Sequence, residues 1–233
     1  MRRSLAIACF VPVAAIAADP GPFFDPGTYL GAGVRSHPEY DGASDQELML
    51  IPLVRYYGPI LFARTTQGIL EGGARAELVK GLFAGVQLAY EEENDRTDLD
   101  PDGSYGVHLE WDTRLGRMPV NLLARARFRF DSDNGSQTDL RASAGVYGTA
   151  RLGVGVFGQA TWGNSDWFRA YYATDGSGLV YTALGVEAQY ELGRHWLLIG
   201  SAQARFLQGE ASSSPITEER TNYYASAGLA YRF

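Results

Sequence analysis

Charged side chains occupy alternate positions in two neighbouring segments of the chain and two positions of the same phase in a third, and they are its clearest candidates for chemistry. They are Glu110, Asp112 and Arg114 in the first segment, Arg125, Arg127 and Arg129 in the second, and Arg141 and Arg151 in the third. A β-strand sends alternate side chains to opposite faces, so each set shares one face. Opposite charges on neighbouring strands pair, whereas rings of charge select ions in pores. We favour a structural charge network that fills a narrow lumen; the alternative is a charged constriction that prefers anions.

The acidic segment 91–103, EEENDRTDLDPDG, is a second candidate site because it holds seven acidic residues and one arginine. Asp98, Asp100, Asp102 and Gly103 match the beginning of a D-x-D-x-D-G calcium loop. The twelfth position of such a loop supplies a bidentate Glu, but here it is Leu109. Without that ligand and without flanking helices, we interpret the segment as a solvated acidic loop, with calcium binding as the alternative.

Enzymatic chemistry requires a nucleophile or a water molecule activated by a positioned base. The chain has three histidines, His37, His108 and His195, and none lies in a recognisable Ser/His or Asp/His motif. We therefore expect a protein that is not an enzyme and that needs no cofactor.

Aromatic residues make up 12% of the chain, including 14 tyrosines. Trp162, Trp167 and Trp196, with many of the tyrosines, fit the aromatic girdles of a membrane interface. Some of the aromatic residues lie between two expected strands, where contact with an external ligand is an alternative use: Trp167, Phe168, Tyr171 and Tyr172.

The composition excludes several classes of protein that such sites would otherwise allow. The 233 residues include 28 glycines, and the mean hydropathy is −0.17. No apolar run approaches the roughly 20 residues of a membrane helix except a short one at the N-terminus. A single cysteine excludes a disulfide scaffold, and a net charge of −7 argues against a nucleic-acid partner. An all-β protein remains, and an outer-membrane barrel combines this mean polarity with lipid contact.

Alternation with period two predicts about twelve strands, with ten as the alternative. The expected strands are 27–36, 47–57, 60–66, 69–79, 81–91, 104–116, 119–131, 138–152, 154–164, 178–192, 195–208 and 221–233. Several are longer than the strands of soluble sheets and long enough to cross a bilayer. Short turns alternate with longer loops, as in bacterial barrels whose long loops face outward. The exception is the tight Gln67-Gly68 turn, which falls on the side of the long loops. We therefore predict a transmembrane antiparallel β-barrel.

Residues 1–17 are predicted to be a Sec-type signal peptide. Arg2 and Arg3 precede an apolar stretch, and Ala15-Ile16-Ala17 provides the small-x-small pattern of a cleavage site. We place cleavage between Ala17 and Ala18, which leaves residues 18–233 as the barrel domain. Loss of the two arginines changes the net charge from −7 to −9.

The final strand carries a candidate assembly signal. Leu229, Tyr231 and Phe233 occupy alternate positions, and the sequence ends on the phenylalanine. An unpaired strand edge invites pairing, so we expect this strand to be read by the outer-membrane assembly machinery.

Several short motifs in a fixed order carry a family resemblance over nearly the whole mature chain. They are Pro38-Glu39-Tyr40-Asp41-Gly42, Ile51-Pro52-Leu53-Val54-Arg55-Tyr56-Tyr57-Gly58-Pro59, Tyr171-Tyr172-Ala173, Gly193-Arg194-His195-Trp196, Ser214-Pro215-Ile216 and Ala227-Gly228-Leu229-Ala230-Tyr231-Arg232-Phe233. Together they resemble the MipA/OmpV family of outer-membrane proteins. Ala173 departs from the pattern, because the family often has Gly after the tyrosine pair.

The resemblance implies an outer-membrane barrel in contact with membrane lipid and lipopolysaccharide. It also implies a scaffold role in peptidoglycan synthesis and remodelling, with a murein transglycosylase and a penicillin-binding protein as partners. A narrow, anion-preferring channel is the alternative function. The family has no established catalytic motif, so the resemblance transfers no catalytic residue.

Overall fold

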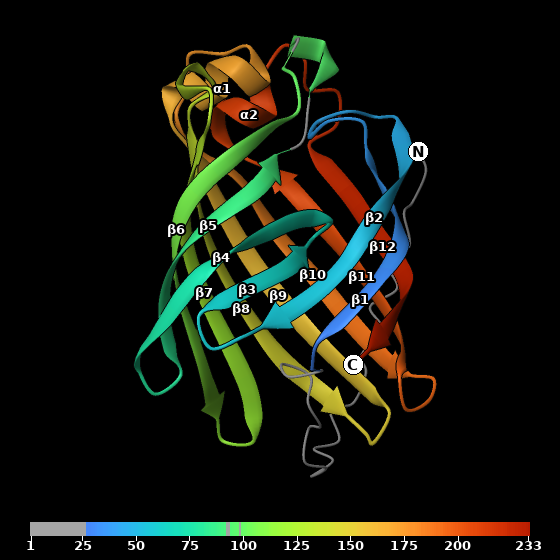
Figure 1. The fold of residues 1–233 in the computed structure, drawn as a ribbon. Coiled ribbons are helices and arrows are strands. Elements are labelled where there is room, and N and C mark those ends of the chain that lie inside the picture. Colours follow the sequence, from blue (N-terminus) through green and yellow to red (C-terminus); the bar gives the residue numbers. More distant parts are fainter. Residues whose placement is uncertain (1–26, 92–93, 98) are drawn as a thin grey trace.

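The computed structural model describes residues 27–91, 94–97 and 99–233, and the strands in these ranges close into one antiparallel barrel (Figure 1). The strands are β1 (Tyr29–Pro38), β2 (Gln46–Tyr57), β3 (Leu61–Thr66), β4 (Ile69–Val79), β5 (Leu82–Glu91), β6 (Asp102–Leu115), β7 (Met118–Arg129), β8 (Ser136–Gly148), β9 (Leu152–Gly163), β10 (Gly178–Glu191), β11 (Trp196–Leu207) and β12 (Thr221–Arg232). Each strand pairs with its neighbours in the sequence, and β1 closes the barrel against β12 from Tyr29↔Arg232 to Ser36↔Ala225. The prediction of an antiparallel barrel with about twelve strands is confirmed.

The barrel is apolar outside and polar inside, the reverse of a soluble protein. Leu48, Leu50 and Leu184 face outward with 78%, 80% and 65% of their surface exposed, whereas Arg35 and Glu71 face inward and are buried. Period-two alternation produces this division because successive side chains point to opposite faces of a strand. Apolar exterior bands around polar interiors are the arrangement of membrane-embedded barrels.

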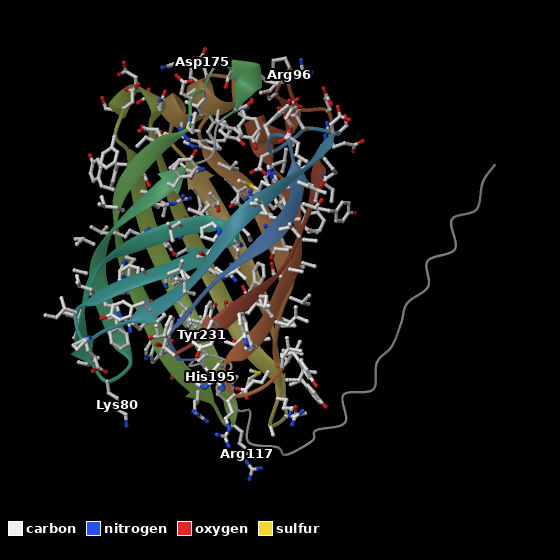
Figure 2. All side chains as sticks on the ribbon, turned by 45° about the vertical axis from the view of Figure 1, so that its right-hand side comes forward. Lys80, Arg96, Arg117, Asp175, His195 and Tyr231 are labelled. Carbon is white, nitrogen blue, oxygen red and sulfur yellow. The ribbon has the colours of Figure 1, made fainter. Side chains whose placement is uncertain are left out.

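The two ends of the barrel differ. Lys80, Arg117 and His195 mark an end closed by tight turns, which we call the short-turn end (Figure 2). Arg96 and Asp175 mark the opposite end, where longer connections fold into a cap (Figure 2). The cap contains η1 (Asp95–Thr97), η2 (Ser132–Asn134), α1 (Ser165–Tyr172) and α2 (Gly209–Ser213). No helix in the described ranges has the length and apolar character needed to cross a membrane.

An aromatic core holds the cap together. Trp167 stacks on Tyr171 with ring centroids 5.0 Å apart, and Phe168 and Tyr172 are fully buried beside them. Asn164 begins α1 by accepting a hydrogen bond from the Trp167 amide at 3.0 Å. The girdle position predicted for Trp167 is therefore wrong, and the alternative of contact with an external ligand is not supported, because these rings are buried in the cap. Trp196, 48% exposed, does face outward.

One strand boundary differs from the prediction and moves a charged residue. β8 ends at Gly148 rather than at 152, because the register with β9 shifts between Gly145 and Tyr147. Such a bulge adds a residue to one strand and ends regular alternation. Arg151 consequently lies in the turn between the two strands, where it is exposed. Its expected place on the inner face is wrong.

The β3–β4 hairpin is hydrogen-bonded to β2 over only a short stretch. Among the described residues, β2 pairs with β3 only from Arg55 to Tyr57, although β2 begins at Gln46. Pro52 of β2 has no amide hydrogen, which suits an edge without a strand partner. The Thr65 hydroxyl instead donates to the Pro52 carbonyl at 2.8 Å and accepts from the Val54 amide at 3.2 Å. Because most of β2 is not paired with β3, the turn after β3 can bend toward the lumen.

Candidate functional site in the barrel lumen

Glu71 on β4 is the centre of the lumen charge network. Its carboxylate accepts from Arg64 Nε at 2.5 Å and from Arg125 Nη1 at 2.8 Å, and it is 1% exposed. Thr66 Oγ1 and Gln87 Nε2 donate to the same carboxylate at 2.7 and 3.1 Å. Buried charges are tolerated only when they are paired and hydrogen-bonded. Glu71 meets that requirement, and it joins β3, β4, β5 and β7 across the lumen.

A second cluster lies beside the first and extends toward the cap. Arg125 Nε donates to Asp139 Oδ2 at 2.6 Å, and Arg127 Nη2 lies 3.2 Å from the same oxygen. Arg127 Nη1 donates to both oxygens of Glu91, at 2.6 and 2.7 Å. The Thr161 hydroxyl completes the surroundings of Asp139 at 2.7 Å. Together the two clusters form a network of ion pairs inside the barrel.

Six of the eight predicted network residues lie on the inner face, and two lie outside the buried network. Those on the inner face are Glu110, Asp112, Arg125, Arg127, Arg129 and Arg141, all buried except Asp112. Arg114 keeps the inward phase of β6 but is exposed at the short-turn end, so the network does not contain it. Arg151 is exposed in the turn described above. Both arginines are therefore corrections to the predicted set.

Sequence reasoning missed most of the acids that neutralise the arginines. Glu71, Glu91 and Asp139 supply the ion pairs above, and Glu187 pairs with Arg141. The signal was available, because Asp139 shares the alternation phase of Arg141, and Glu91 is both the last residue of the expected strand 81–91 and the first of the segment that was interpreted as a loop. Glu91 in particular is inside the barrel rather than in the solvated acidic loop.

A polar layer crosses the lumen at the β3–β4 turn. Gln67 Nε2 donates to Gln159 Oε1 on β9 at 3.1 Å and to Gln203 Oε1 on β11 at 2.9 Å. Gly68 lies close to Arg35: a Cβ atom on Gly68 would be 2.7 Å from the Cδ atom of Arg35. The tight turn therefore lies inside the barrel, which explains why a short turn falls among the long loops.

A cavity of about 510 Å³ lies on the short-turn side of this layer. The Gln67-Gly68 turn is part of its lining, as is Arg64. Asp112 and Gln189, also in the lining, lie toward the short-turn end. We call this cavity the short-turn chamber.

The remaining predicted residues lie elsewhere. Asp98 and the cleavage site Ala17–Ala18 fall outside the described residues, and Asp100 is exposed. Asp102 accepts from the Gly103 and Asp131 amides, at 2.6 and 3.2 Å. Across the described ranges, no group of three His, Cys, Asp or Glu residues is placed to hold a metal ion.

The assembly-signal residues and the histidines lie at the wall and its ends. Leu229, Tyr231 and Phe233 face outward with 41%, 38% and 75% exposure. His108 is buried edge-on against Phe62, with ring centroids 5.1 Å apart, and His195 stacks on Tyr231 at 5.3 Å. His37 Nδ1 lies 2.7 Å from the Pro38 carbonyl oxygen.

Comparison with solved structures places the fold among outer-membrane barrels. The COG4313 outer membrane channel from Pseudomonas putida F1 superposes with a TM-score of 0.58 at 13% identity, covering 93% of this chain and 100% of the other. The NanC porin superposes with a TM-score of 0.55 at 12% identity, covering 89% of this chain and all of the other. At these identities the likeness shows the fold alone. No curated protein matches the sequence.

The family model for "MltA-interacting protein MipA" matches residues 30–233, which is nearly all of the barrel. The resemblance drawn from the short motifs is thereby confirmed. The chain belongs to the MipA family and is an outer-membrane β-barrel protein.

Proposed function

We propose that this protein is an interaction protein of the cell envelope, which binds enzymes of peptidoglycan synthesis and remodelling at its periplasmic end. The family to which it belongs is described as MltA-interacting, and the resemblance implies a murein transglycosylase and a penicillin-binding protein as partners. The short-turn end faces the periplasm if the barrel follows the usual orientation of bacterial barrels. A Sec-type signal peptide, residues 1–17, fits this destination.

The observation that carries the proposal is a basic rim at the short-turn end. Five exposed cationic residues form it: Lys80, Arg114, Arg117, Arg151 and Arg194. Only two exposed acids, Glu77 and Asp112, lie on the strand ends beside them within the described ranges. The whole chain has a net charge of −7, so this concentration of positive charge is local. Complementary charge speeds encounter and fixes orientation at an interface, so the rim suits an acidic partner surface.

The test is a pull-down of a murein transglycosylase and a penicillin-binding protein with the purified full chain. We expect wild type to retain them and the triple variant Lys80→Glu/Arg117→Glu/Arg194→Glu to lose most of the binding. The matched control reverses three exposed arginines of the cap, Arg96, Arg169 and Arg220. Equal retention by both variants, or no retention by wild type, would contradict the proposal.

The alternative is a narrow channel, and the short-turn chamber is the observation that favours it. The lining of the chamber includes four arginines. Single-channel recording in a planar bilayer tests this function directly. Stable anion-selective conductance by wild type supports the channel, whereas cation preference contradicts it, and partner retention with no conductance favours the interaction protein.

A further inference from the structure

We propose that the short-turn chamber is a binding site for a small acidic sugar, a solute that carries one carboxylate on a polyhydroxylated body. The inference is independent of the proposed function, because it depends on the inside of the barrel and not on its rim. The chamber volume of about 510 Å³ lies in the range of roughly 300–1,000 Å³ that small-molecule sites occupy.

The charge of the lining sets the charge of the ligand. Its ionisable side chains are the arginines Arg55, Arg64, Arg75 and Arg141 and the acids Glu110, Asp112 and Glu187. Arg64 is already paired with Glu71 and Glu110, and Arg141 with Glu187. Arg75 is a lining cation that Glu110 approaches only to 3.7 Å, so one positive group is available to a solute. A monocarboxylate matches the single charge of Arg75, whereas a doubly charged phosphate ester would exceed it in a low-dielectric site.

Arg75 is the residue best placed to receive the carboxylate. Its guanidinium carbon lies 4.2 Å from the ring centroids of both Tyr57 and Phe83. Its closest ion-pair contact, Glu110 Oε2, is 3.7 Å from Nη1, beyond a hydrogen bond. Glu110 already accepts from Arg64 at 3.1 Å and from Asn121 at 2.8 Å. The rings therefore fix the plane of the Arg75 fork while its N–H edges can still donate to a carboxylate.

Arg55 lies beside the same ring and is a second positively charged side chain of the lining. Its guanidinium carbon lies 4.6 Å from the Tyr57 centroid, and its side chain is part of the chamber lining.

Neutral polar groups line the rest of the chamber and define the body of the ligand. They are Asn121, Ser143, Gln189, Ser201 and Ser226. Ser201 and Ser226 share a hydrogen bond of 2.8 Å between their hydroxyls. Hydroxyl and amide groups both donate and accept, so they match the hydroxyls of a sugar better than an aliphatic acid. Tyr29 and Tyr57 add aromatic faces to the same lining.

Three sugars that differ only at C6 test the proposal by calorimetry on the purified full chain in detergent micelles. Glucuronate carries the carboxylate, glucose lacks it, and glucose 6-phosphate replaces it with a dianion. We expect glucuronate to bind at least about tenfold more tightly than either of the others. No binding of glucuronate, equal binding of glucose, or preference for glucose 6-phosphate would overturn the proposal.

Variants locate the site. Arg75→Gln is expected to weaken glucuronate binding by at least about tenfold, and Arg55→Gln gives a second measurement if the first variant does not fold. Arg114→Gln is the matched control, because Arg114 is exposed on β6 and outside the chamber lining. Wild-type affinity in both Arg75→Gln and Arg55→Gln, or an equal loss in Arg114→Gln, would show that the chamber is not the binding site.

Discussion

Glu71 is the residue through which the lumen network holds opposite sides of the barrel together. It lies on β4, and its partners Arg64 and Arg125 lie on β3 and β7. Removing one member of a buried ion-paired set leaves the remaining charges without compensation, and this costs more than the pairing itself contributes. The network is therefore fragile to single changes even though each pair adds little net stability.

We expect Glu71→Gln to lower the free energy of unfolding by about 3–5 kcal/mol, because Arg64 and Arg125 would remain buried beside a neutral amide. Urea unfolding of the purified protein in lipid vesicles measures the change. Glu47→Gln is the control, since Glu47 is exposed on β2, and it should stay within about 0.5 kcal/mol of wild type. A loss of stability for Glu71→Gln smaller than about 3 kcal/mol would show that water solvates the network.

Glu218 makes the cap sensitive to acid. Hydrogen bonds from the Ser44 hydroxyl and amide, together with Arg96, hold the pKa of its carboxyl below the ordinary value of 4.5. A lowered pKa means that the contact stabilises the cap above pH 4.5 and that this contribution is lost as the pH falls through the folded-state pKa. We expect the Ser44 amide resonance to titrate below pH 4.5 in NMR spectra. The titration should vanish in Glu218→Gln, and its persistence there would assign it to another group.

At the level of whole elements, alternation predicted which face each side chain occupies but not which residue it meets. The inward phase of β7 was assigned correctly from Arg125, Arg127 and Arg129. Their partners Glu71 and Glu91 lie 54 and 36 positions away, and period two carries no information about position around a barrel. α1 was missed because eight residues give little periodicity, although Asn164 supplied a capping signal.

The β3–β4 turn reaches across the lumen, and Gly68 is where its effect on conductance can be tested. Its φ of +91° suits glycine, and a side chain there would meet Arg35. We expect Gly68→Val to displace the turn, break the contacts of Gln67 with Gln159 and Gln203, and give ion conductance in a planar bilayer where wild type gives little.

Gly116→Val is the matched control for that experiment. Gly116 also has a positive φ, +64°, but nothing lies within 4 Å of its Cβ position. Backbone strain of about 1–3 kcal/mol should lower its stability without opening the lumen. Equal conductance from the two variants would point to general loosening of the barrel, and a silent Gly68→Val would mean that other side chains keep the lumen closed.

At the scale of the whole molecule, the barrel must be inserted as well as folded, and Phe233 separates the two requirements. Its ring is 75% exposed and meets Tyr231 with centroids 5.4 Å apart, while its amide donates to the Thr28 carbonyl. An exposed ring adds little to stability, so Phe233→Ala should refold in detergent as wild type does. If the terminal aromatic is read by the assembly machinery, the amount of folded protein in the outer membrane should nevertheless fall several-fold. Tyr223→Ala, at the other end of β12 and 65% exposed, should leave that amount unchanged. An equal fall in both variants, or a refolding defect in Phe233→Ala, would make the terminal ring a matter of stability rather than recognition.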